Sequence, residues 1–146
     1  MSKIINGLYL GSYYDAINEK FMKTHHISAV LNVAMEIEKS PYVKYENYMH
    51  LKIDDEPHEN LLNFIKQGVC FIHKYISSGK NVFVHCHLGK SRSVAIIRAY
   101  LMIYNNMTYK QAKSYVKTRR HIAEPNPGFE TQLNQFEKKI KKCFNF

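Results

Sequence analysis

The sequence predicts an α/β protein with a mainly parallel, twisted central sheet of about five strands, flanked by about six helices. Short apolar runs rich in β-branched residues alternate along the chain with longer segments whose apolar residues recur every three or four positions. No repeat, linker or low-complexity stretch divides the 146 residues, and a chain of that length can form one core. We therefore expect a single domain over residues 1–146.

The first half of the chain predicts strands with one early helix. Ile4–Leu10 reads as two strands around Asn6-Gly7, because Asn-Gly favours a hairpin turn. A helix is expected over about Asp15–Thr24. The apolar run Ala29–Val33 predicts a buried strand, and the alternation in Tyr48–Ile53 predicts a strand with one buried face.

The second half predicts four helices around one strand. A helix is expected from Leu61 to Ile76, with Cys70 in the core, and the strand Asn81–His85 follows it. The next helix, Ser93–Asn105, is largely apolar. A capping box at Thr108 and Gln111 opens a further helix that ends near Arg120, and the last helix, Glu130–Lys142, follows a break at residues 125–128.

Composition excludes some classes of protein and leaves others open. The chain is 45% hydrophobic and 13% aromatic, which is too high for a disordered protein. Its net charge of +9 predicts an anionic partner or substrate, which could be nucleic acid, a phosphoprotein, a phospholipid or an acidic membrane. The longest apolar region, Val94–Tyr104, contains Arg98 and is too short to span a bilayer.

Cysteine usage and the N-terminal residues predict a reduced chain inside the cell. Cys70, Cys86 and Cys143 cannot all pair, and neither they nor the scattered histidines have the spacing of metal ligands. No secretory signal is present. We expect no metal and no cofactor.

The segment from Cys86 to Ser93 carries the chemistry. Cys86 ends a buried strand, and a tight turn containing Gly89 leads directly into a helix. The backbone N–H groups of such a loop, with the positive end of the helix dipole, can bind an anion. Arg92, six positions after Cys86, can grip the same anion through two guanidinium nitrogens. This field favours the thiolate form of the cysteine, which is the nucleophile that attack on a phosphate monoester requires.

The pattern His85-Cys86-x-x-Gly89-x-Ser91-Arg92-Ser93 resembles the signature loop of the cysteine-dependent protein tyrosine phosphatases, in the form found in dual-specificity phosphatases. The resemblance extends over about residues 4–137, through Ile5–Ser12, Ile27–Ala34, Ala99–Met102 and Pro125-Asn126-x-x-Phe129. It implies an atypical member that consists of the catalytic domain alone. It also implies hydrolysis of phosphotyrosine and phosphoserine or phosphothreonine in proteins.

The resemblance implies a role for each residue of the loop. Cys86 forms a phosphocysteine intermediate, Ser93 stabilises its thiolate as it leaves, and His85 orients it. Arg92 binds the phosphate together with the rest of the loop, namely His87, Leu88, Gly89, Lys90 and Ser91, and Asn126 supports the site.

The general acid of this family is an Asp on an upstream loop, and both Asp54 and Asp55 are candidates. The family pattern places the acid five residues before an Asn that opens the next helix. Counting back from Asn60 selects Asp55, with Asp54 as the alternative. The same carboxyl then serves as the base that activates water.

Arg119 and Arg120 precede Pro125-Asn126, where relatives place an arginine near the rim of the pocket. They could form a second anion contact. The alternative is an ordinary basic helix end without a role in the site.

Two other functions compete with the protein phosphatase. A phosphoinositide or other non-protein phosphomonoester phosphatase is the alternative, because His87 and Lys90 add positive charge to the loop. A catalytically inactive phosphate-binding module is disfavoured, because such relatives lack the cysteine, the arginine or the acid, and all three are present here.

The C-terminal residues Cys143–Phe146 have the length of a prenylation box and follow a lysine cluster, Lys138, Lys139, Lys141 and Lys142. Asn145 fits the box poorly, and the alternative is the plain end of an amphipathic helix. We expect a cytoplasmic monomer, with the nucleus as an alternative, that binds phosphoproteins but not nucleic acid. Membrane contact is expected only if Cys143 is lipidated.

Overall fold

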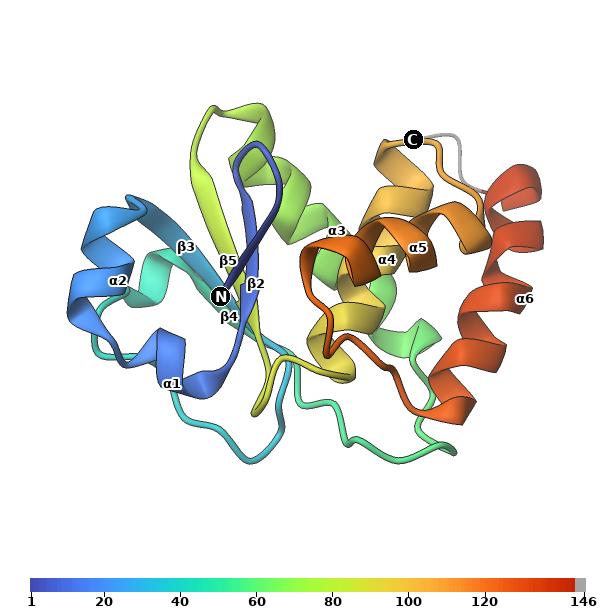
Figure 1. Cartoon of the computed structure of the whole chain (residues 1–146), viewed down its shortest axis with the longest axis horizontal. Coiled ribbons are helices and arrows are strands. Elements are labelled where there is room, and N and C mark those ends of the chain that lie inside the picture. The colour runs from blue at the N-terminus through green and yellow to red at the C-terminus, as the bar shows by residue number, and fades with distance from the viewer. Residues whose placement is uncertain (144–146) are drawn as a thin grey trace.

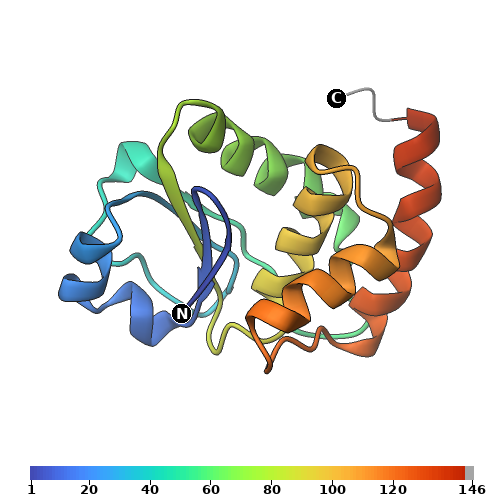
Figure 2. The same ribbon diagram turned by 45° about the horizontal axis from the view of Figure 1, so that its top comes forward.

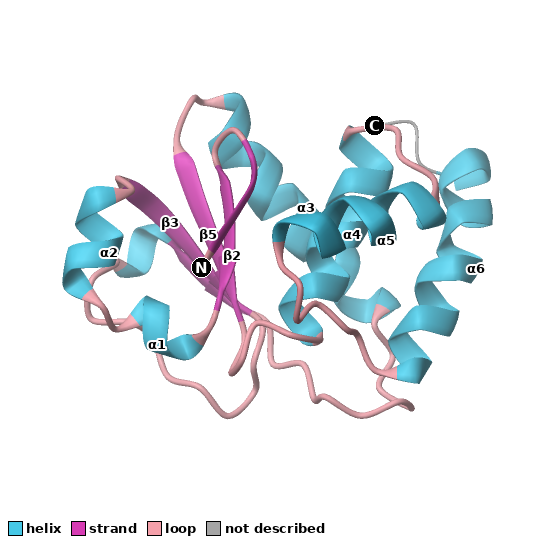
Figure 3. Cartoon of the chain, viewed as in Figure 1, coloured by secondary structure: helices cyan, strands magenta, loops and turns pink. Residues whose placement is uncertain are grey.

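The computed structural model describes residues 1–143 and the side chains of residues 1–140. Within that part, a five-stranded sheet is flanked by six α-helices (Figures 1 and 3), which agrees with the expected fold class. The strands are β1 (Ser2–Ile5), β2 (Leu8–Gly11), β3 (Ile27–Asn32), β4 (Tyr48–His50) and β5 (Asn81–His85). The helices are α1 (Tyr13–Ala16), α2 (Glu19–Thr24), α3 (Leu62–Ser77), α4 (Arg92–Tyr104), α5 (Tyr109–Arg119) and α6 (Pro127–Cys143), and a 3₁₀ turn covers Tyr45–Asn47.

The sheet has the strand order β1-β2-β5-β3-β4. β1 and β2 form the antiparallel hairpin expected around Asn6-Gly7, and the remaining strands pair in parallel. Parallel pairing brings the carboxyl ends of β2, β5 and β3 together, since Gly11 and Asn32 both lie opposite His85. The segments that follow these strands gather at one edge of the sheet (Figure 3), where ligands bind in open α/β sheets.

Alternate residues of each strand face two different apolar clusters. In β5, Val82 and Val84 face the larger cluster beneath α3 and α4, whereas Phe83 faces a smaller one beneath α1 and α2. Figure 2 shows these two groups of helices on opposite faces of the sheet, with α6 packed outside α4 and α5.

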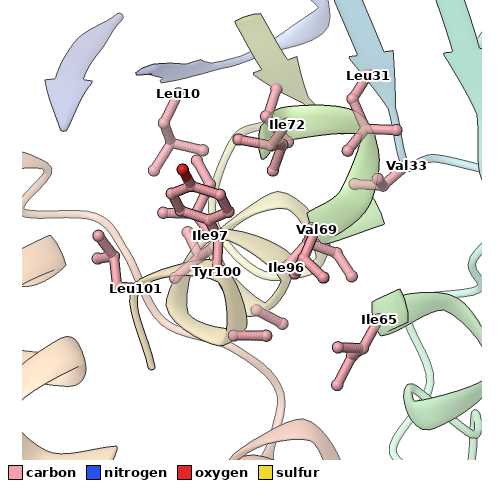
Figure 4. Packing of buried hydrophobic residues seen from close by; sticks show 14 of the residues in the cluster. Leu10, Leu31, Val33, Ile65, Val69, Ile72, Ile96, Ile97, Tyr100 and Leu101 are labelled. Atoms are coloured by element: carbon pink, nitrogen blue, oxygen red, sulfur yellow. The ribbon is translucent and has the colours of Figure 1, made fainter. Parts of the chain in front are cut away.

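α4 is buried over most of its length because it lies between the sheet and the other helices. Figure 4 shows its side chains in contact with residues of the strands and of α3, including Ile96, Ile97, Tyr100, Leu101, Leu10, Leu31, Val69 and Ile72. Burial of each such side chain contributes about 1.5–3 kcal/mol. The helix that begins at Arg92 is therefore held rigidly.

Some expected elements differ from those in the structure. The strand expected over Tyr48–Ile53 ends at His50, which lies opposite Asn32, the last residue of its partner β3. The alternation was still informative, since Leu51 and Ile53 are buried.

The helix expected over Asp15–Thr24 is two short helices. The break follows from two caps: Ser12 and Asp15 form a capping box on α1, and the side chain of Asn18 accepts a hydrogen bond from the Phe21 N–H and starts α2. Cys70 was expected in the core and is exposed, on the solvent side of α3.

Candidate active site

The loop of residues 86–91, called the Cys86 loop below, joins β5 to the N-terminus of α4. Gly89 has a φ of 69°, and a Cβ at this position would lie 2.6 Å from the Gly11 carbonyl oxygen. The Tyr13 N–H donates to the His87 carbonyl over 2.9 Å. The loop is thus packed closely against the end of β2, and only glycine fits at its centre.

Cys86 lies at the base of this loop with 3% of its surface exposed. Its Sγ lies 3.1 Å from the Oγ of Ser93, in the first turn of α4. The hydroxyl can donate to a thiolate, and the positive end of the helix dipole points toward the same sulfur.

His85 supports the cysteine from inside the sheet. Its Nδ1 lies 3.0 Å from the Cys86 carbonyl oxygen, and since a carbonyl only accepts, this nitrogen carries the hydrogen. Burial lowers the pKa of His85 to about 4, so the ring is neutral at physiological pH.

Arg92 is held by an acidic residue that sequence reasoning missed. Its Nη1 and Nη2 donate to the two carboxylate oxygens of Glu36 over 2.6 and 2.8 Å, and Nη1 also donates to the Ile53 carbonyl over 3.1 Å. The hydrogen bond from Arg92 lowers the pKa of Glu36 to about 2, so this carboxylate stays ionised. Burial by itself would lower the pKa of Arg92, but the hydrogen bond to Glu36 and the charges of Cys86, Glu36 and Asp55 together outweigh burial and raise that pKa above its usual value.

One signal could have found Glu36. It follows β3 by a few residues, and β3 is the parallel neighbour of β5, which precedes the Cys86 loop. Residues that follow the carboxyl ends of neighbouring parallel strands meet at one edge of the sheet.

Asp55, and not Asp54, is hydrogen bonded to the Cys86 loop. Its Oδ1 accepts from the Ser91 hydroxyl at 2.7 Å and from the Asn126 side-chain amide at 2.9 Å. The Asn126 backbone N–H donates to the same Ser91 hydroxyl over 2.9 Å. Two donors on Oδ1 leave Oδ2 free to carry a proton. The backbone N–H of Asp54 binds Glu59 instead.

The two candidate arginines lie in different surroundings. Arg120 donates to the carbonyls of Gly89 and Leu88 over 2.6 and 3.1 Å, so its guanidinium is bound to the back of the loop. Arg119 stacks on Tyr115 and donates to Thr118, and the structure does not bring it to the loop.

Comparison with known proteins decides the family of this chain. Residues 8–139 match the family model described as "Dual specificity phosphatase, catalytic domain". The chain belongs to this family. It is 41% identical to dual specificity protein phosphatase 1B of Arabidopsis thaliana over 97% of the chain and 84% of the relative. It is 33% identical to human dual specificity protein phosphatase 22, over 94% of the chain and 74% of the relative.

Solved structures agree. The crystal structure of human DUSP28 superposes with a TM-score of 0.90 at 28% identity, covering 97% of this chain and 98% of that chain. The protein is accordingly a hydrolase, a dual-specificity protein phosphatase that uses the cysteine-based mechanism. The resemblance noted in the sequence is confirmed.

The positive charge of the phosphatase loop is partly compensated. Lys90 Nζ lies 3.6 Å from the Glu124 carboxylate, in a contact exposed to solvent.

The His87 ring lies 6.2 Å from that of Tyr14, whose exposed side chain borders the loop.

The described part of the phosphatase bears on two expectations, that it has no metal site and no segment long enough to span a bilayer. Among its described residues, no group of three His, Cys, Asp or Glu side chains is placed to hold a metal ion. None of its described helices combines the length and apolar character that crossing a membrane requires. The two alternatives for Cys143–Phe146, a prenylation box or the plain end of an amphipathic helix, fall on residues whose side chains lie outside the described residues.

Proposed function

We propose that this phosphatase uses Cys86 as nucleophile, Arg92 as phosphate ligand and Asp55 as general acid and base. The Cys86 sulfur attacks phosphorus in line and forms an S–P bond. The bond from phosphorus to the leaving oxygen breaks, and that oxygen takes its electron pair and the proton on Asp55 Oδ2. Arg92 and the N–H groups of the loop bind the remaining phosphoryl oxygens.

The second step returns the enzyme to its starting state. Asp55 removes a proton from water, the water oxygen bonds to phosphorus, and the S–P bond breaks. The departing Cys86 thiolate receives a hydrogen bond from Ser93, whose hydroxyl lies 3.1 Å away. Inorganic phosphate leaves, and Asp55 is protonated again.

The observation that carries this proposal is the hydrogen bond between Ser91 and Asp55. Ser91 belongs to the Cys86 loop, and its hydroxyl donates to the carboxylate over 2.7 Å. The Asp55 carboxyl group is thereby held at the same short loop that carries the Cys86 sulfur, at one edge of the sheet. This supports a reaction that needs both groups on one phosphoryl group.

We infer that the substrates are phosphorylated proteins. We further propose that residues 1–146 form one catalytic domain and that the phosphatase is a monomer in the cytoplasm, with the nucleus as the alternative compartment. The carboxylate of Glu124, 3.6 Å from Lys90 Nζ, supports protein substrates over phosphoinositides, because its negative charge lowers the net positive charge that a polyanionic headgroup would meet beside the loop. In the described part, Cys70 and Cys86 are free thiols, which supports a reducing compartment.

The test compares substrates and variants. Wild-type enzyme should hydrolyse phosphotyrosine and phosphothreonine peptides faster than phosphoinositides in mixed micelles. Cys86→Ser should abolish turnover and retain peptide binding in a calorimetric titration. Asp55→Asn should lower kcat on phosphothreonine peptide by about 10²–10⁴-fold. Turnover by Cys86→Ser would contradict the mechanism, and preference for the phosphoinositide would contradict the substrate class.

A further inference from the structure

The segment that carries the proposed acid, residues 54–60, is called the Asp55 loop below. It has no regular secondary structure, and most of its side chains are exposed. A loop of this kind would ordinarily move on its own. Helix α6 and the residue before it, Asn126, lie more than sixty residues later in the sequence and contact this loop at three separate points.

The first contact is made by the side chain of Gln132 at the end of the loop. Its Oε1 accepts from the Leu61 N–H over 2.8 Å, and its Nε2 donates to the Glu59 carbonyl, also over 2.8 Å. Leu61 is the N-cap residue of α3 and has no side chain that could cap the helix. The Asn60 side chain accepts from the Leu62 N–H over 3.2 Å as a local cap, and Gln132 adds an acceptor for the Leu61 N–H. Gln132 thereby fixes the two peptide groups on either side of Asn60.

The second contact is a backbone approach in the middle of the loop. A Cβ at Gly128 would overlap the Pro57 carbonyl group, so the first turn of α6 touches the loop with no side chain between them. The third contact is at the acid itself, where the Asn126 amide binds Asp55. The Oδ1 of Asn126 meanwhile accepts from the Phe129 N–H over 2.9 Å in the first turn of α6.

α6 is itself attached to the helix that carries Arg92. The guanidinium of Arg98, in α4, lies 2.5 Å from the Glu130 carboxylate. Phe129, Leu133 and Phe136 are fully or nearly fully buried. The Asp55 loop is thus fixed, through α6, to the same frame as the Cys86 loop.

We propose that α6 is a clamp that holds Asp55 in position over the Cys86 loop before substrate arrives, and that Gln132 is its principal positioning residue. The inference deepens the proposed function and rests on Asp55 being the acid. Its consequence is specific: loss of the clamp weakens proton delivery to the leaving oxygen and leaves attack by Cys86 intact. The damage should therefore depend on how much the leaving group needs a proton.

The experiment compares two substrates and two matched variants. A phosphothreonine peptide needs protonation of its alkoxide, whereas difluoromethylumbelliferyl phosphate releases a stable anion. The measured quantity is kcat/KM, because it reports the steps up to formation of the phosphocysteine and not its hydrolysis, which is the same for both substrates. Gln132→Ala should lower kcat/KM on the peptide by about tenfold, a part of the full acid contribution, and change kcat/KM on the fluorogenic ester less than about twofold. Gln135→Ala, an exposed glutamine of the same helix, should leave both unchanged.

A second variant covers the case in which Gln132→Ala does not fold. Gln132→Glu keeps an acceptor for the Leu61 N–H but places a carboxylate oxygen against the Glu59 carbonyl, so a loss with the same selectivity for the peptide is expected. Equal loss on both substrates in the variant that folds, or behaviour identical to Gln135→Ala, would overturn the clamp.

Asp55→Asn separates this inference from the proposed function. If it slows the peptide selectively and the Gln132 variants do not, only the clamp is wrong. If it lowers kcat/KM equally for both substrates, Asp55 is not the acid, and the proposed function fails together with the clamp.

Discussion

At the scale of single residues, the site combines an ion pair, Glu36 and Arg92, with a buried histidine, His85, that stays uncharged. Glu36 and Arg92 are ionised in each other's presence. His85 is buried as a neutral ring, with its Nδ1–H bound to the Cys86 carbonyl. Protonation of His85 would place an uncompensated charge inside the sheet. The fold therefore excludes the proton that an unfolded chain would accept.

This exclusion predicts a pH dependence of stability. The pKa of His85 is about 4 in the folded protein and near its ordinary 6.5 in the unfolded chain. Between these values the unfolded chain binds the extra proton, so the free energy of unfolding falls as pH decreases, by up to about 1.4 kcal/mol per pH unit. The contribution is fully present above pH 6.5. Urea unfolding from pH 7 to pH 4 should show a weaker dependence in His85→Asn.

The matched control is His26→Asn. His26 is exposed and has a φ of 51°, a conformation that Asn tolerates well. This variant should keep the pH dependence of the wild-type protein. A His85→Asn protein with the wild-type slope would show that His85 is not the group responsible.

At the scale of elements, the critical contact is between the Cys86 loop and the end of β2. Gly89 lies against the Gly11 carbonyl, while Arg120 binds the carbonyls of Leu88 and Gly89 from behind. With its carbonyls turned toward Arg120, the loop can direct its N–H groups to the opposite side, where the phosphate binds.

Gly89→Ala should therefore abolish turnover and binding of orthovanadate. An added Cβ would meet both the Gly11 carbonyl and the Arg120 guanidinium at 2.6 Å, which the loop can avoid only by moving. Gly79→Ala is the control, since Gly79 has a similar φ of 73° but nothing within 4 Å of the added Cβ. Gly79→Ala should lose about 1 kcal/mol of stability and keep full activity. Normal vanadate binding by Gly89→Ala would contradict the close packing.

At the scale of the whole molecule, one hydrogen-bonded network around the buried Arg98 joins three helices. Arg98 in α4 is 1% exposed and pairs with Glu130 in α6, which also accepts a hydrogen bond over 2.7 Å from the hydroxyl of Tyr109 in α5. The helices that carry or fix Arg92 and Asp55 are thus joined beneath the site.

Removal of one partner of this pair should cost more than removal of both. Glu130→Leu leaves the Arg98 guanidinium buried without its counter-charge, and we expect a loss of about 3–5 kcal/mol in the free energy of unfolding. The double variant Arg98→Met/Glu130→Leu should recover most of that loss, because no buried charge remains. Unfolding of the wild-type protein, Glu130→Leu and the double variant in guanidinium chloride measures the loss of stability and its recovery. A double variant less stable than Glu130→Leu would show that Arg98 has other partners of greater weight.

The sequence predicted what local patterns control. The apolar run Asn81–His85 is β5 with the same bounds, and the capping box at Thr108 opens α5. It did not predict Glu36 or Gln132. Their hydrogen-bond partners lie 56 and 71 residues away, respectively, and no periodicity or cap connects residues so far apart. Such contacts depend on how the strands are ordered in the sheet, which local patterns do not contain.

α6 begins beside Asp55 and runs along the right-hand end of the molecule in Figure 1, from its lower to its upper edge, a span of about 25 Å for its 17 residues. An affinity tag or solid support joined beyond this helix would be remote from the site where a phosphoprotein docks. Immobilised Cys86→Ser protein, attached through its C-terminus, is therefore suited to capturing substrates from cell extracts.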